Sequence, residues 1–207
     1  MLATAAFAAL MSLSTAQAAV IEQNLSIPLA DTDWQQNLSV QQFNGALGSL
    51  NRVSFSVGGT MQSQAWFFDI VANSSASSSF TGAISFNLPQ IGLLQLIFEG
   101  ADDYLLTAGN DVGPLDGIEH QDQQGDWTES ALAWFVGTGQ YVVNVSADAV
   151  SQVSSSGNYG SEIGTQASAW LKVSYDYTPT RQAVPEPGAL ALVGLALAAA
   201  ALIRRRA

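Results

Sequence analysis

Ala167-Ser168-Ala169-Trp170-Leu171-Lys172-Val173-Ser174-Tyr175-Asp176-Tyr177 is the stretch that decides the fold class of this 207-residue chain. Small, aliphatic or aromatic residues occupy every odd position, and mostly polar residues occupy the even ones. A period of two places alternate side chains on opposite faces of an extended strand, so one face is predicted to lie in a core. The same alternation recurs at 53–57 and 141–149. These stretches predict strands rather than helices.

Other parts of the chain have a similar composition, and strands are also predicted at 21–29, 35–40, 64–71, 80–88 and 93–98. Glycine and serine clusters are interpreted as breaks between strands, at 58–59, 73–79, 137–139 and 154–160. A helix of about two turns is predicted after Asp126, where Asp126-Trp127-Thr128-Glu129 fits a capping box. Many short strands separated by such breaks are typical of an all-β domain, here a single antiparallel β-sandwich or jelly roll.

The C-terminal end differs from this body. Val184-Pro185-Glu186-Pro187 is followed by an uncharged run rich in Ala and Leu over 188–203, and then by Arg204, Arg205 and Arg206. As a helix the run would reach only ~24 Å, which is shorter than the ~30 Å hydrocarbon core of a bilayer. We therefore predict a short transmembrane helix that holds the chain transiently in the inner membrane, with the arginines on the cytoplasmic side.

The N-terminal end carries a second apolar stretch, Leu2 to Leu13, which Ala16-Gln17-Ala18 follows. Small residues at Ala16 and Ala18 fit the cleavage rule of signal peptidase. Residues 1–18 are therefore interpreted as a signal peptide that directs the chain to the Sec translocon. The predicted organisation is this signal peptide, an exported domain at 19–180 and a sorting and anchoring segment at 184–207.

The C-terminal segment resembles the PEP-CTERM sorting signal. Pro185, Glu186 and Pro187 correspond to the residues that name the signal, and Arg204 to Arg206 correspond to its terminal basic cluster. The resemblance implies a protein exported by a Gram-negative bacterium that makes exopolysaccharide. It also implies cleavage near the motif by an exosortase, a membrane transpeptidase-like enzyme, and a final place on the cell surface or in the extracellular matrix.

The body resembles the choice-of-anchor E family of exported domains. The segments that carry this resemblance are 32–40, 42–44, 47–50, 115–117, 135–139 and 177–179. The family is defined by its architecture, so the resemblance brings no catalytic residues with it. Two features depart from the pattern, the aromatic run Trp66-Phe67-Phe68 and the acidic stretch at 99–129.

Composition excludes several classes of function. The absence of cysteine excludes disulfides, a thiol nucleophile and a lipidated anchor, and the lone His120 excludes a zinc site rich in histidine. A net charge of −11 would repel nucleic acid. The chain has no Gly-x-Ser-x-Gly motif, so no enzyme is predicted. A polysaccharide-acting enzyme that uses two carboxylates stays as the weakest alternative.

The stretch 99–129 contains nine acidic residues: Glu99, Asp102, Asp103, Asp111, Asp116, Glu119, Asp122, Asp126 and Glu129. Carboxylate oxygens suit Ca²⁺, and Asn110, Asp111 and Asp116 would be the first candidates for such a loop. Neither an EF-hand nor a Gly-Gly-x-Gly-x-Asp repeat is present in the sequence. A solvated acidic loop is therefore the preferred interpretation, and no cofactor is predicted.

Trp170 supports a second hypothesis. It lies on the strand face opposite Ala169 and Leu171, where an exposed indole could stack on a sugar ring as in lectin-like jelly rolls. The leading hypothesis is a non-enzymatic protein with a structural or adhesive role linked to exopolysaccharide or biofilm. The alternative is a carbohydrate-binding module.

Overall fold

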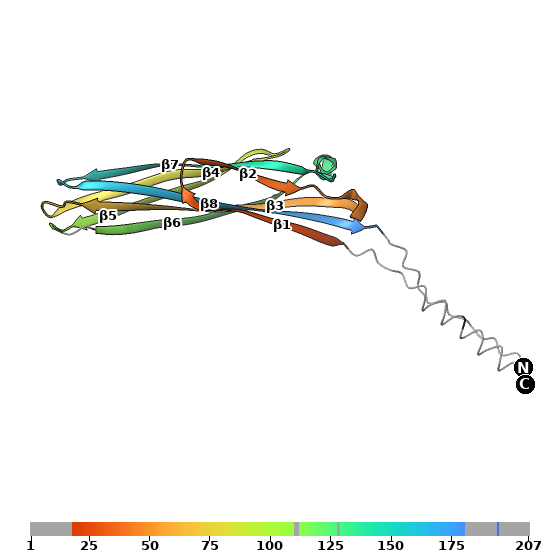
Figure 1. The fold of residues 1–207 in the computed structure, drawn as a ribbon, viewed down its shortest axis with the longest axis horizontal. Coiled ribbons are helices and arrows are strands. Elements are labelled where there is room, and N and C mark those ends of the chain that lie inside the picture. The colour runs from red at the N-terminus through yellow and green to blue at the C-terminus, as the bar shows by residue number, and fades with distance from the viewer. Residues whose placement is uncertain (1–17, 110–111, 128, 181–193, 195–207) are drawn as a thin grey trace, which may run out of the picture.

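The computed structural model describes residues 18–109, 112–127, 129–180 and 194, and within them the chain is almost entirely extended (Figure 1). The strands of this part are β1 (Ala19–Asp31), β2 (Trp34–Gln41), β3 (Gly48–Phe68), β4 (Ser74–Leu88), β5 (Gly92–Leu106), β6 (Val112–Asp126), β7 (Gln140–Ser155) and β8 (Gly160–Pro179). Two short 3-10 helices accompany them, η1 (Gly45–Leu47) and η2 (Glu129–Phe135). The predicted all-β class with antiparallel sheets is confirmed.

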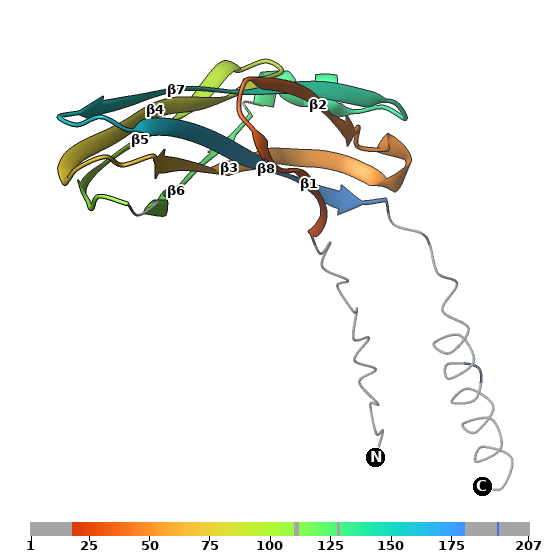
Figure 2. The ribbon, with the colours of Figure 1, turned by 60° about the vertical axis from the view of Figure 1, so that its left-hand side comes forward.

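The strands form two sheets, which lie as two layers in Figure 2. Sheet A has the order β1-β8-β3-β6, and sheet B has the order β2-β7-β4-β5. The first strand pairs with the last, β2 with β7, β3 with β6 and β4 with β5, all antiparallel. This order arises when a long hairpin ribbon is wrapped around a core, as in jelly rolls.

The apolar residues of each alternating strand also form the core between the sheets. Val143, Val145, Leu171 and Val173 are buried, while their neighbours in sequence point outward. The side chains of opposite sheets meet there and exclude water from the space between them. Large aromatic side chains, including Phe86, complete this core.

Two of the predicted breaks are wrong. β3 continues through Gly58 and Gly59, where the side chains of Trp170 and Ile84 take the space that a Cβ atom would need. The glycines are therefore strand residues that make room for neighbours, and they do not mark a turn. The serine-rich cluster at 73–79 is also not a break, because β4 begins at Ser74.

The acidic stretch is likewise not the expected loop. Its described residues belong mainly to β5 and β6. These are the edge strands of sheets B and A on one side of the sandwich. The helix predicted after Asp126 is present as the 3-10 helix η2. The predicted breaks at 137–139 and within 154–160 are confirmed by the gaps between η2, β7 and β8.

One end of the sandwich gathers the start of β1, the end of β8 and the two 3-10 helices (Figure 1), and we call it the terminal end. Ala19 pairs there with Tyr177. Thr180 is bonded to the η1 segment, because its N–H donates to the Leu47 carbonyl at 3.0 Å and its Oγ1 to the Ala46 carbonyl at 3.1 Å. The predicted signal peptide and transmembrane helix lie outside the described residues, apart from Ala18 and residue 194. No helix among the described residues is long and apolar enough to cross a membrane.

Candidate functional site

A shallow trough of about 520 Å³ lies on the outer face of sheet A, the face that points away from sheet B. It runs over β3 and is flanked by β6 on one side and by β8 on the other. The residues that line it are Arg52, Ser54, Phe55, Ser56, Gln124, Gly125, Asp126, Lys172 and Ser174.

Strand register explains why a trough forms at this place. Ser54 lies opposite Asp126 of β6 and Ser174 of β8, and in the next row Ser56 lies opposite Gln124 and Lys172. Residues directly opposite each other in a sheet share a face. The central strand thus carries short side chains, while mostly longer ones rise from the flanking strands. The sheet surface is therefore hollowed along β3.

Trp170 stands in the row beyond the trough, opposite Gly58. Its indole lies where a Cβ atom of Gly58 would be, so the glycine allows the ring to settle over the central strand. The side chain is still 39% exposed. Its outward position agrees with the prediction from the alternation at 167–177.

Both basic residues of the described part of the chain border this trough. Arg52 forms a two-point ion pair with Asp126, with Nε to Oδ1 at 2.9 Å and Nη2 to Oδ2 at 2.6 Å, which raises the pKa of the guanidinium. Lys172 pairs with Glu22 of β1, with Nζ to Oε1 at 2.7 Å, and this hydrogen bond lowers the pKa of Glu22. The charged groups are therefore held in defined positions at the rim.

The Glu22–Lys172 pair yields a titration that can be measured. Replacing Lys172 by methionine is expected to return the pKa of Glu22 to its ordinary value, because the ammonium hydrogen bond is the main cause of the lowering. Because the pKa of Glu22 is lowered in the folded state, the ion pair stabilises the fold at pH values above the pKa of the unfolded state. This stabilisation is lost as the pH falls through the pKa of the folded state. The measurement is an NMR titration of the Glu22 carboxyl. Ser174→Ala is the control and should change the pKa less, because Ser174 Oγ lies 3.4 Å from Glu22 Oε1 and contributes least. An unchanged pKa in Lys172→Met would contradict the assignment.

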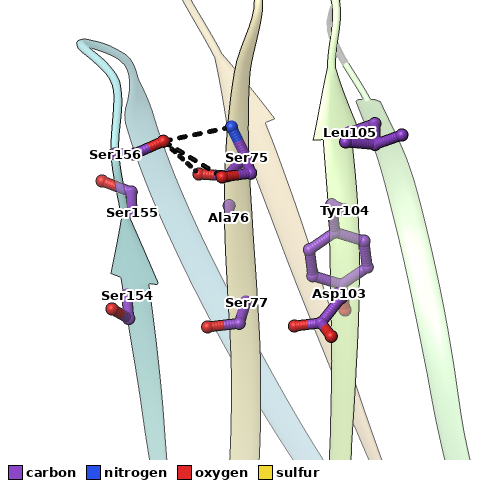
Figure 3. Close-up of a pocket in the computed structure, with 9 residues that line it drawn as sticks. All are labelled: Ser75, Ala76, Ser77, Asp103, Tyr104, Leu105, Ser154, Ser155 and Ser156. Carbon is purple, nitrogen blue, oxygen red and sulfur yellow. Dashed lines mark hydrogen bonds between the residues drawn. The ribbon is translucent and has the colours of Figure 1, made fainter.

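A second depression, of about 510 Å³, lies over β4, β5 and β7 at the far end of sheet B (Figure 3). Serine hydroxyls dominate its lining, and Ser75 and Ser156 bond to each other with their Oγ atoms 3.0 Å apart. Among its lining residues Asp103 alone is charged, and Tyr104 is buried. The trough on sheet A is the better candidate because it combines both signs of charge with a neighbouring exposed indole.

The sorting residues predicted from the sequence are almost all outside this part of the molecule. Ala18 is exposed and directly precedes β1. The remainder, Ala16, Pro185, Glu186, Pro187, Arg204, Arg205 and Arg206, lie outside the described residues.

The acidic stretch does not converge on a metal site in the part of the chain that the structure describes. Glu99, Asp102 and Asp103 are on β5, and Asp122 and Asp126 are on β6. No group of three or more His, Cys, Asp or Glu side chains that could hold a metal ion occurs among the described residues. Asn110 and Asp111 of the candidate calcium loop are not among these residues.

Several trough residues were not singled out from the sequence: Arg52, Ser54, Ser56, Gln124, Asp126 as an ion-pair partner, Lys172 and Ser174. Their outward position follows from the alternation in their strands. Their neighbourhood depends on the pairing of β3 with β6 and β8, and these strands are far apart in sequence.

Comparison with known proteins identifies the C-terminal segment. Residues 183–206 match the model of the PEP-CTERM protein-sorting motif. The PEP-CTERM motif implies an exported, membrane-transiting protein of a Gram-negative bacterium that an exosortase processes. No curated protein matches the chain in sequence.

The chain is also similar to solved structures of infectious bursal disease virus, at low identity. It matches the structure of the Gx strain with 14% identity and a TM-score of 0.22, covering 78% of this chain and 37% of the viral chain. It matches the T13 particle with 15% identity and a TM-score of 0.20, covering 86% of this chain and 46% of the viral chain. This chain therefore spans less than half the length of either viral chain.

Proposed function

We propose that this protein is a non-enzymatic cell-surface or matrix protein that contacts exopolysaccharide through the trough on sheet A. The PEP-CTERM motif supports export and sorting of the chain. The observation that carries the polysaccharide contact is the trough itself, with the exposed Trp170 in the row beside it.

The side chains of the trough have the chemistry that sugars require. A sugar ring has an apolar C–H face, which can stack on an indole, and hydroxyl groups around its rim. Ser54, Ser56 and Gln124 can donate and accept hydrogen bonds, and Arg52 and Asp126 supply charged donors and acceptors. The trough is open and shallow, which fits a polymer that passes across the surface better than a small molecule that must be enclosed.

The charges at the trough favour binding over catalysis. Glu22 and Asp126 are each paired with a basic side chain. A general acid in glycoside hydrolysis needs a raised pKa, whereas Lys172 lowers the pKa of Glu22. Glu22 therefore lacks this feature of a general acid, and our proposal includes neither hydrolysis nor a cofactor.

The biological role follows from these elements and the sequence resemblance. The exported domain is proposed to be of the choice-of-anchor E type, to cross the membrane through the Sec translocon and to be released by exosortase. Its structural or adhesive role would lie in organising exopolysaccharide or biofilm at the cell surface. A carbohydrate-binding module with a narrow sugar preference is the second candidate, and the trough favours it too.

A single incubation tests this proposal. The purified protein is mixed with exopolysaccharide from the host and sedimented, and reducing ends are measured in the supernatant. We expect co-sedimentation without release of reducing ends. Release of reducing ends that is lost in Asp126→Asn would show an enzyme, and the absence of co-sedimentation would refute the polysaccharide contact. A panel of unrelated polysaccharides separates a general matrix protein from a module with a narrow preference.

A further inference from the structure

We propose that the terminal end of the sandwich rests on a phospholipid surface while the C-terminal signal holds the chain in the membrane. This inference rests on the proposed function only through the predicted membrane anchor. It does not depend on the trough, which lies on the outer face of sheet A.

Exposed apolar side chains gather at the terminal end. Leu47 of η1 is 44% exposed, Val136 is 42% exposed and Trp134 of η2 is 39% exposed. We call these three residues the terminal apolar patch. An exposed tryptophan beside aliphatic residues is the composition that proteins use at the boundary between water and lipid headgroups.

Backbone contacts hold the patch together. The Phe43 N–H donates to the Phe135 carbonyl at 2.8 Å, and the Gly137 N–H donates to the Phe43 carbonyl at 2.9 Å. These bonds fix the segment around η1 against the end of η2. Val136 reaches the η1 segment, since its Cγ1 would lie 3.1 Å from a Cβ atom on Gly45. Leu47 and Val136 thus lie on two segments that these contacts join, and Trp134 belongs to the second of them.

The segments around the patch are also free of charge. Residues 41–51, 130–142 and 178–180 contain no Asp, Glu, Lys or Arg, although the chain has 17 acidic residues. Asp69, Asp102 and Asp103 lie toward the opposite end, whereas Arg52 and Asp176 lie just beyond these segments, in β3 and β8. A carboxylate close to anionic headgroups would be repelled, so these uncharged segments are the part of the terminal end that can approach a membrane.

The tether brings this end to the membrane. Thr180 is bonded directly to Ala46 and Leu47, and the uncharged C-terminal run begins at Gly188. Eight residues of extended chain span at most about 29 Å. β8 alone, with 20 residues, is about 66 Å long. The anchor therefore keeps the terminal apolar patch close to the bilayer and lets the far end of the sandwich project outward.

The absence of cysteine from the chain allows a direct test with single labels. Leu47→Cys and Val136→Cys place a polarity-sensitive fluorophore in the patch. Leu105→Cys and Val71→Cys, at positions 90% and 70% exposed near the opposite end, are the matched controls. The labelled full chains are reconstituted in phosphatidylethanolamine and phosphatidylglycerol vesicles that contain spin-labelled lipid as the quencher.

We expect the labels at 47 and 136 to shift their emission to the blue and to be quenched several-fold more than the labels at 71 and 105. Equal quenching at all four positions in chains that float with the vesicles would overturn this inference and leave the anchor intact. Chains that do not float would overturn the anchor and this inference together. Polysaccharide binding, measured separately, distinguishes either failure from a failure of the proposed trough function.

Discussion

Replacement of Trp170 by alanine is expected to weaken polysaccharide binding about tenfold or more. The indole is the large exposed aromatic group beside the trough, and truncating an aromatic hot-spot residue of an interface costs about 2 kcal/mol or more. A loss of about 1.4 kcal/mol already corresponds to a factor of ten in affinity. The measurement is a titration of wild type and Trp170→Ala with the host exopolysaccharide.

Phe68→Ala is a closely matched control for this substitution. Phe68 is 41% exposed, lies on the same outer face of sheet A and occupies the Cβ space of Gly160, as Trp170 does at Gly58. It stands ten residues farther along β3 than Gly58, away from the trough. Its removal should leave the affinity unchanged. Equal losses in both variants would point to a general effect on the sheet, and an unchanged affinity in Trp170→Ala would refute the site.

Gly59→Ala is expected to destabilise the fold by about 2–3 kcal/mol, as overpacking of a core does. The new Cβ atom would lie 2.8 Å from the backbone oxygen of Ser168 and would collide with Ile84 in the opposite sheet. Ser168 pairs with Thr60 in the ladder between β3 and β8, so its oxygen cannot retreat without disturbing that ladder. For a domain of this size, thermal unfolding should shift down by about 2–4 °C per kcal/mol.

Gly164→Ala supplies the matched comparison. Its Cβ atom would lie 3.3 Å from the ring of Trp66, which is a side chain that can adjust. We therefore expect a change in unfolding free energy of less than about 1 kcal/mol, partly offset by the lower entropy of the unfolded chain. If both variants melt at the same temperature, the close approach of Ser168 and Ile84 to Gly59 does not destabilise Gly59→Ala as predicted.

The strands were predictable wherever one face is buried. The alternations at 141–149 and 167–177 correspond to β7 and β8, because burial of one strand face leaves an apolar residue at every second position. Gly58 and Gly59 were misread, because local propensity favours a break at paired glycines. Trp170 and Ile84 come from distant parts of the chain and approach β3 closely at these two positions. Glycine leaves room for them there.

The trough was less predictable than the strands. The outward position of Trp170 follows from the alternation in its own strand. The rows that align Ser54 with Asp126 and Ser174 depend on two non-local pairings. A shift of one residue in either pairing would turn a different set of side chains outward. Local sequence contains little information on such a register.

The pairing of the first strand with the last has a consequence for the order of events during export. β1 has its only sheet neighbour in β8, among the described strands, and β8 also lies between β1 and β3. Sheet A therefore cannot close until residues 160–179 have emerged on the far side of the membrane. The sorting motif matches from residue 183, only a few residues later. The sandwich can therefore complete its fold only when nearly all of the chain that precedes the sorting motif has been exported.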